Sequence, residues 1–243
     1  MARLEDLVAA QHRRYLVLQH RAADLTGRLW DQFGGPGDDN LAAFVGHVTP
    51  IVLGARQHTV DLMAGYLSLV VRSTVPVDAR GVLDAIRGGV PIGEVYGRPI
   101  ISMRSALAEG RDLAEADAIA RERATSTART DVILANRAAA VDGMSRSDRI
   151  SGYRRVPTGG SCAYCVGAAD QEYGSDQLMP IHNNCDCGIA PIVGAHDPGK
   201  ILNRSLPELA ADAPTAAVHE HGELGPVLGD AGHDFTGPDD VAA

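Results

Sequence analysis

Long hydrophobic runs are missing from this chain, and aromatic residues are scarce. No stretch reaches the ~18 to 20 consecutive apolar residues that a membrane-spanning helix requires, so we expect a soluble protein with no membrane partner. Only 4% of the 243 residues are aromatic, whereas alanine, leucine, valine and arginine are common, and this composition favours packed helices over a sheet sandwich. Glycine-rich phosphate loops and the Gly-x-Ser-x-Gly nucleophile motif are also absent. The sequence therefore predicts a mainly α protein of the α+β kind. It indicates neither an enzyme with a glycine-rich phosphate loop nor one with a Gly-x-Ser-x-Gly nucleophile.

Basic residues are missing from the C-terminal end. Residues 205–243 contain eight acids and no Lys or Arg, which leaves 23 acids and 22 bases in residues 1–204 and accounts for nearly all of the net charge of −9. The near-neutral body offers no broad basic surface of the kind that drives non-specific nucleic-acid binding, so we expect at most weak or indirect contact with DNA. Residues 196–243 are rich in Ala, Pro, Gly and acids, and we expect a partly ordered acidic tail there.

The N-terminal half has the periodicity of long amphipathic helices. Apolar residues recur at steps of three, four or seven from Leu4 to Phe33, which predicts one helix of about eight turns. A glycine-rich turn at 34–37 ends it, and a second helix is predicted from Asp38 to Val70 with a kink or break at Pro50. Two such helices usually pack antiparallel, because neither can bury its apolar stripe alone.

Glycine and proline interrupt residues 75–99, which we expect to be a connector with room for one short helix over 78–87. Helix signals resume over 100–109, and a longer Ala-rich helix is predicted over 113–141, where Gly143 ends it. The many charged residues of this last helix indicate a solvated helix that packs along one face.

Short runs between Gly and Pro predict strands over 153–156 and 188–193. A β-hairpin of this size has too little apolar surface to be stable alone, so a bound metal would contribute folding energy directly. Farther on, residues 218–228 contain enough apolar residues to dock on the rest of the protein. The chain thus divides into three predicted parts, a helical region (1–149), a zinc-stabilised β-hairpin module (150–195) and the acidic tail (196–243).

Five potential metal ligands, which include every cysteine of the chain, lie within 26 residues: Cys162, Cys165, His182, Cys185 and Cys187. A Cys-x-x-Cys pair directs both thiolates onto one ion, and the second cluster can complete a tetrahedron around Zn²⁺. We predict a structural zinc bound by four of these five residues. Two sets share the Cys-x-x-Cys pair: one adds His182 and Cys185, and the other adds Cys185 and Cys187.

Other roles for the cysteines fit the sequence less well. The even count also allows disulfides, but Met1 leads directly into a charged amphipathic pattern without a secretory signal, so we expect reduced cysteines. A catalytic zinc needs an open coordination position and a nearby acid or base, and a thioredoxin-like redox pair needs a strand followed by a helix N-terminus. The sequence gives little support for either. We interpret the histidines near the C-terminal end as surface residues: His219, His221 and His233.

The order of these features resembles a known family. Arg129-Thr130-Asp131 and Ala135-Asn136 lie on the predicted long helix, before Cys-x-x-Cys and Pro-x-His-x-x-Cys-x-Cys. This arrangement resembles the Mu F-like minor capsid, or head morphogenesis, proteins of tailed bacteriophages, over about residues 112–194. The chain departs from the family pattern at two positions, where Asn183 replaces a usual proline and Asp186 a frequent arginine. The positions that match the C-terminal motif are Cys162, Cys165, Gly167, Pro180, His182, Asn184, Cys185, Cys187 and Pro191.

The resemblance implies a non-enzymatic virion component that associates with the portal protein or the major capsid protein during procapsid assembly and assists DNA packaging or ejection. It places the protein in the capsid interior or near the portal, and in the host cytoplasm during assembly, with no small-molecule substrate. The alternative hypothesis is a zinc-ribbon protein that binds nucleic acid or has a regulatory role.

Overall fold

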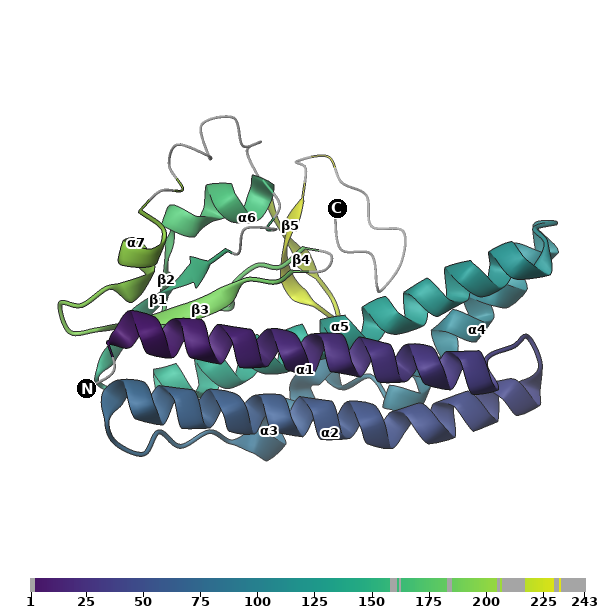
Figure 1. Cartoon of the computed structure of the whole chain (residues 1–243), viewed down its shortest axis with the longest axis horizontal. Helices are drawn as coiled ribbons and strands as arrows, with labels where there is room; N and C mark the ends of the chain where they lie inside the picture. Colours follow the sequence, from purple (N-terminus) through teal and green to yellow (C-terminus); the bar gives the residue numbers. More distant parts are fainter. Residues whose placement is uncertain are drawn as a thin grey trace.

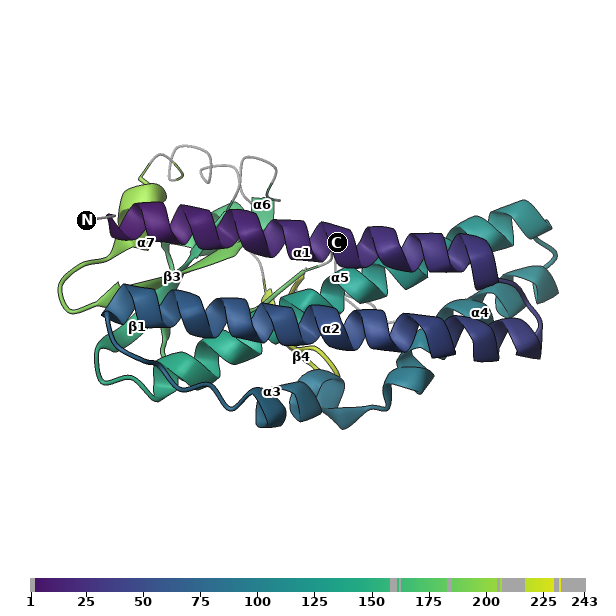
Figure 2. The same cartoon turned by 60° about the horizontal axis from the view of Figure 1, so that its bottom comes forward.

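Long helices run the length of the molecule, and a small sheet lies across one end of them (Figures 1 and 2). A computed structural model describes residues 3–157, 161, 163–182, 185–204, 206, 217–229 and 232. The helices that build the body are α1 (Leu4–Phe33), α2 (Asp38–Val71), α3 (Ala79–Ala85), the short 3-10 turn η1 (Ile86–Gly89), α4 (Ile92–Ala108) and α5 (Leu113–Ser145). No helix in the described ranges is long and apolar enough to cross a membrane.

The first two helices form the antiparallel pair that the sequence predicts. The periodic stripe of α1 places Val8, Tyr15 and Trp30 in the core, and α2 packs along it. The predicted break at Pro50 is wrong, because α2 continues from Asp38 to Val71 without interruption. Pro50 lies on the exposed side of α2, where water can replace the hydrogen bond that its missing N–H would make.

The predicted connector over 75–99 is too long, because α4 begins at Ile92 and contains Pro99. Gly97 explains how this helix is stabilised. A Cβ added there would lie 3.3 Å from the side chain of Leu41 on α2, so the absence of a side chain allows the two helices to approach closely. Packing of this kind outweighs the weak helix propensity of the glycines and the proline.

Helix α5 lies at the centre of the body rather than on its surface. It contacts α1, α2 and α4, so the prediction of a solvated helix with one packed face is wrong. The helix also passes through Gly143 and ends at Ser145. A Cβ on Gly143 would lie 2.6 Å from the side chain of Leu67, so this glycine marks a close helix contact and not a helix end.

The two predicted strands are present and belong to a three-stranded antiparallel sheet with the order β2-β1-β3. Its strands are β1 (Ile150–Val156), β2 (Glu172–Gly174) and β3 (Gly188–Val193). Short helices α6 (Ala163–Gly167) and α7 (Pro198–Leu202), with the 3-10 turn η2 (Ala168–Asp170), surround the sheet. Strand β3 contacts α1 and α2, which fixes the sheet against the helical body.

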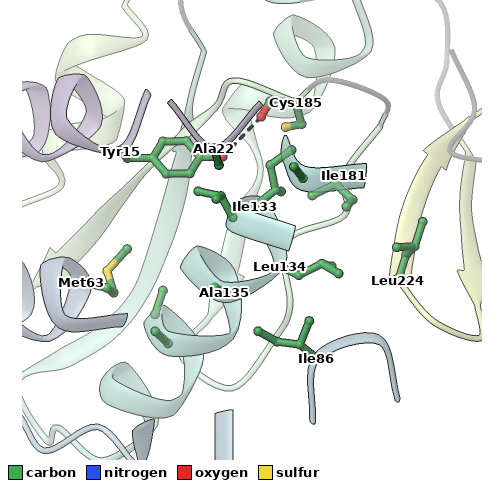
Figure 3. Packing of buried hydrophobic residues seen from close by; sticks show 14 of the residues in the cluster. Tyr15, Ala22, Met63, Ile86, Ile133, Leu134, Ala135, Ile181, Cys185 and Leu224 are labelled. Carbon is green, nitrogen blue, oxygen red and sulfur yellow. Dashed lines mark hydrogen bonds between the residues drawn. The ribbon is translucent and has the colours of Figure 1, made fainter. Parts of the chain in front are cut away.

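A second hairpin, β4 (Ala217–His221) and β5 (Gly225–Gly229), comes from the predicted docking segment 218–228. It is joined to the segment before β3, since Ile181 N–H donates to Pro226 O at 3.2 Å and Leu228 N–H donates to Ile181 O at 2.6 Å. Ile181 and Leu224 belong to the same buried cluster as Leu134 of α5, and Figure 3 labels all three. The hairpin therefore shares the core with the helices.

A buried carboxylate links four elements of the body. Asp131 of α5 is fully buried and accepts hydrogen bonds from Arg56 of α2 at 2.6 Å, Arg87 of η1 at 2.7 Å and Tyr96 of α4 at 3.0 Å. Burial tends to raise the pKa of Asp131, but the two guanidinium groups outweigh it and hold the pKa below its usual value. The ionised carboxylate therefore neutralises cations from two other elements.

We expect Asp131→Asn to lower the free energy of unfolding by about 3 to 5 kcal/mol, because it removes the carboxylate that pairs with buried Arg56 and leaves Arg87 only its more distant partner Glu223. Urea unfolding followed by circular dichroism measures this change. Asp24→Asn, at an exposed position on α1, is the matched control and should change the stability by less than about 0.5 kcal/mol. Equal effects of the two substitutions would show that the buried ion pairs do not stabilise the fold.

Candidate metal centre

Three cysteines from separate parts of the chain meet beneath α1. Cys165 lies in α6, and Cys185 and Cys187 lie in the segment that leads into β3. Their sulfur atoms all lie within 4.8 Å of one another, and the Cys165 and Cys185 sulfurs are 4.0 Å apart. A tetrahedral zinc with Zn–S bonds of ~2.3 Å places its sulfurs about 3.8 Å apart. The three sulfurs could therefore hold one metal ion.

His182 is the fourth of the predicted ligands that the structure describes. Its Nε2 atom lies 2.9 Å from the Cys165 sulfur, and the residue is only 7% exposed. Cys162, the remaining predicted ligand, lies outside the described residues. Four of the five predicted ligands thus lie together, and which four bind a metal stays a prediction.

The cluster is closed to solvent and its cysteines are reduced. Each of the three cysteines is at most 1% exposed, and none of them forms a disulfide. Thiolates and imidazole are the donors that structural zinc sites use, and such sites are closed by protein ligands on all sides. The donor set therefore fits zinc.

The side chain of Arg155 enters the cluster from β1. Its Nη1 atom lies 2.8 Å from the Cys165 sulfur, 3.6 Å from that of Cys187 and 3.7 Å from that of Cys185. Its Nη2 atom donates to the carbonyl oxygen of Pro180. Strand alternation places Arg155 on the buried face of β1 with Tyr153, whereas Arg154 faces the other way and pairs with Asp197.

The thiol groups of Cys185 and Cys187 have pKa values that are shifted in opposite directions. Hydrogen bonds from Cys165 and Cys187 hold the pKa of the Cys185 thiol well below its usual value, although burial opposes the shift. For Cys187, the hydrogen bond with Cys165 lowers the pKa, but the hydrogen bond with Cys185 and burial outweigh it and raise the pKa to about 12. Without a metal, the Cys185 sulfur is therefore the thiolate of this pair that faces Arg155, whereas a bound metal ion would deprotonate its thiol ligands.

Helix α1 holds the backbone between two of the cysteines. Tyr15 Oη donates to Cys185 O at 3.4 Å, as Figure 3 shows, and Gln19 Nε2 donates to the same oxygen at 3.2 Å. His12 Nε2 lies 2.5 Å from Asp186 O. We call His12, Tyr15 and Gln19 the α1 clamp. The apolar periodicity of α1 identifies Tyr15 as a core residue. It does not identify His12 and Gln19, although both are polar residues at positions of the apolar stripe.

A second support comes from α5 and the β4–β5 hairpin. Arg137 is buried and donates from Nη1 to Met179 O at 3.0 Å and to Pro226 O at 3.1 Å, so it joins α5 to the hairpin and to the segment before His182. His221, which we predicted to be a surface residue, is 9% exposed. Its Nδ1 atom accepts hydrogen bonds from Glu223 N–H and Leu224 N–H, both at 3.2 Å, and so stabilises the turn of the hairpin. His233 lies outside the described residues.

Comparison with known proteins gives one match. A family model described as VG15 protein matches residues 102–204, and the chain is similar to that family over this range. The range extends from α4 to just beyond α7, so it includes α5, the three-stranded sheet and all five predicted metal ligands. No curated protein and no solved structure matches the chain. The likeness to Mu F-like capsid proteins therefore rests on the motif residues alone.

We expect Gln19→Leu to lower the free energy of unfolding by about 1 kcal/mol, because it removes the shorter of two hydrogen bonds to a buried carbonyl group and leaves only that from Tyr15. Chemical unfolding of the purified protein measures the change. His20→Leu, at the exposed next position of α1, is the control for adding a leucine to this helix. Similar small effects of both changes would remove Gln19 from the support of the metal centre.

Proposed function

We propose that the protein is a non-enzymatic minor capsid protein, also called a head morphogenesis protein, of a tailed bacteriophage. It associates with the portal or the inner capsid during procapsid assembly and carries a structural zinc. The observation that carries this proposal is the buried cluster of Cys165, Cys185, Cys187 and His182, which occupies the positions of the motif that resembles the Mu F-like family.

A structural role for the metal follows from how the cluster is enclosed. Its cysteines have almost no exposed surface, and the α1 clamp, Arg155 and the β4–β5 hairpin surround it. A catalytic zinc keeps an open position for water or substrate, and the described side chains at this cluster leave little room for one. The metal would instead connect α6, the segment before β3 and the helical body.

An apolar groove provides a surface for an assembly partner. A hollow of about 1030 Å³ lies where the start of α1, the end of α2 and α7 meet. Leu69 and Ile201 line it and are 61% and 43% exposed, respectively. Arg3, Arg72 and Arg149 lie along the same hollow. Exposed apolar surface bordered by polar residues is typical of protein interaction sites, and the size of this groove suits a helix or loop of a partner subunit.

We expect the purified protein to contain one zinc ion per chain, and its removal by EDTA to lower the midpoint of thermal unfolding by more than about 10 °C, because metal binding is coupled to folding. Native mass spectrometry with metal analysis measures the zinc content, and calorimetry measures the midpoint of thermal unfolding. EDTA already saturated with zinc is the control for chelator effects unrelated to the metal. A protein that contains no metal, and whose melting EDTA does not change, would contradict the zinc part of the proposal.

We expect Leu69→Asp to weaken association with the portal protein or major capsid protein at least tenfold, because it places a charge in the apolar groove. The assay co-expresses the chain with each of these proteins from the same genome and measures affinity by interferometry. Leu113→Asp is a matched control, since Leu113 is also 61% exposed but lies at the start of α5, at the opposite end of the helices. Absence of binding to either partner, combined with steeply salt-dependent binding to DNA, would favour the zinc-ribbon alternative.

A further inference from the structure

Arg155 is a buried cation whose nearest partners are the sulfurs of the cluster. It is fully buried, and one nitrogen, Nη1, lies within 3.7 Å of all three described cysteine sulfurs. An arginine keeps its charge under all ordinary conditions, and a buried charge is costly unless an opposite charge balances it. No carboxylate forms an ion pair with Arg155 among the described residues, so its balance must come from the thiolates.

The single charge of Arg155 distinguishes the possible ligand sets. A divalent metal bound by three thiolates and a neutral histidine carries one net negative charge, which one guanidinium group neutralises. A divalent metal bound by four thiolates carries two net negative charges. One of these charges would remain unbalanced in a buried site. Burial of an unbalanced charge is strongly unfavourable, so the presence of one arginine favours three thiolates.

The other charged groups near the cluster do not alter this balance. Arg137, the next buried cation, donates to the carbonyl oxygens of Met179 and Pro226. Asp186 lies between Cys185 and Cys187 in the sequence and is only partly buried. Its negative charge opposes the positive charge of Arg137. Among the described ligands, the sulfurs of Cys165, Cys185 and Cys187 lie together, and His182 Nε2 lies 2.9 Å from the Cys165 sulfur.

We propose that Arg155 is the permanent counter-charge of the zinc site, and that this site is bound by three thiolates and His182. This inference rests on the proposed structural zinc. Arg155 is a positioning residue, which donates N–H groups to the metal-bound thiolates and fixes them to Pro180 O through its second nitrogen.

The ligand set is tested with Co²⁺ in place of zinc in the full chain. The sulfur-to-cobalt charge-transfer absorption grows with the number of thiolates, and the visible bands distinguish three sulfurs and one nitrogen from four sulfurs. We expect the former pattern in the native protein. His182→Ala should change the spectrum and weaken binding at least tenfold. A four-sulfur spectrum in the native protein, or an unchanged spectrum in His182→Ala, would overturn the proposed set.

The role of Arg155 is tested by chelator competition for zinc. We expect Arg155→Gln to weaken zinc binding about 10- to 100-fold and to shift the charge-transfer bands of the Co²⁺ form. Arg155→Lys, which keeps the charge, should recover part of the affinity. Arg154→Gln, on the opposite face of the same strand, should leave both affinity and spectrum unchanged. Native-like zinc affinity in a folded Arg155→Gln protein would overturn the role of the arginine.

Two kinds of failure are distinguishable. A native protein that binds neither zinc nor Co²⁺ would reject the structural zinc itself, and the inference with it. A native protein that binds zinc with a four-sulfur spectrum would reject the inference alone. If Arg155→Gln does not fold, the spectrum of the native protein still decides the number of thiolates, and Arg155→Lys still tests the charge requirement.

Discussion

The ion pairs of Asp131 are the constraint on which the arrangement of the helices depends. One carboxylate of α5 binds side chains from α2, η1 and α4, so none of these elements can move without breaking a hydrogen bond to a buried charge. Arg87 also has a φ of 57°, a conformation that residues other than glycine rarely adopt, and its bond to Asp131 helps to hold it there. The network extends to the hairpin, because Glu223 lies 3.5 Å from Arg87 and also binds Arg98 of α4 at 2.7 Å. Asp131 lies within the range that matches the VG15 family model, and its role in this structure is to organise the body.

The metal centre is part of this body and not an independent module. The α1 clamp holds the carbonyl groups of Cys185 and Asp186, while the β4–β5 hairpin pairs with Ile181, next to His182. The ligand segment is therefore fixed from two sides before any metal binds, which lowers the entropy that metal binding must remove. In return, a metal would connect α6 to this fixed segment. The stabilities of the helices, the hairpin and the metal centre should therefore depend on one another.

Sequence patterns predicted those parts of the structure that repeat along the chain. The stripe of α1 and the strand over 188–193 were correctly placed, because period and turn residues identify such elements locally. The continuation of α4 through Pro99 and of α5 through Gly143 was missed, since both depend on contacts with α2 that lie far away in the sequence. The cysteines and histidine were recognisable by spacing, whereas the α1 clamp lies more than 160 residues from its partners. Arg155 was missed because no local pattern marks an arginine as buried.

The choice of arginine over lysine connects these observations. The chain has a single lysine, Lys200, and each of the buried cations Arg56, Arg87, Arg137 and Arg155 is an arginine. A guanidinium group can bind two different partners at fixed angles, whereas an ammonium group is a compact point charge that retains its water strongly. Arg87 binds Asp131 and lies within 3.5 Å of Glu223, and Arg155 reaches the sulfurs and Pro180 O at once. Arg87 and Arg155 each therefore join two segments besides their own, so a lysine that kept the charge would still lose one of the two connections.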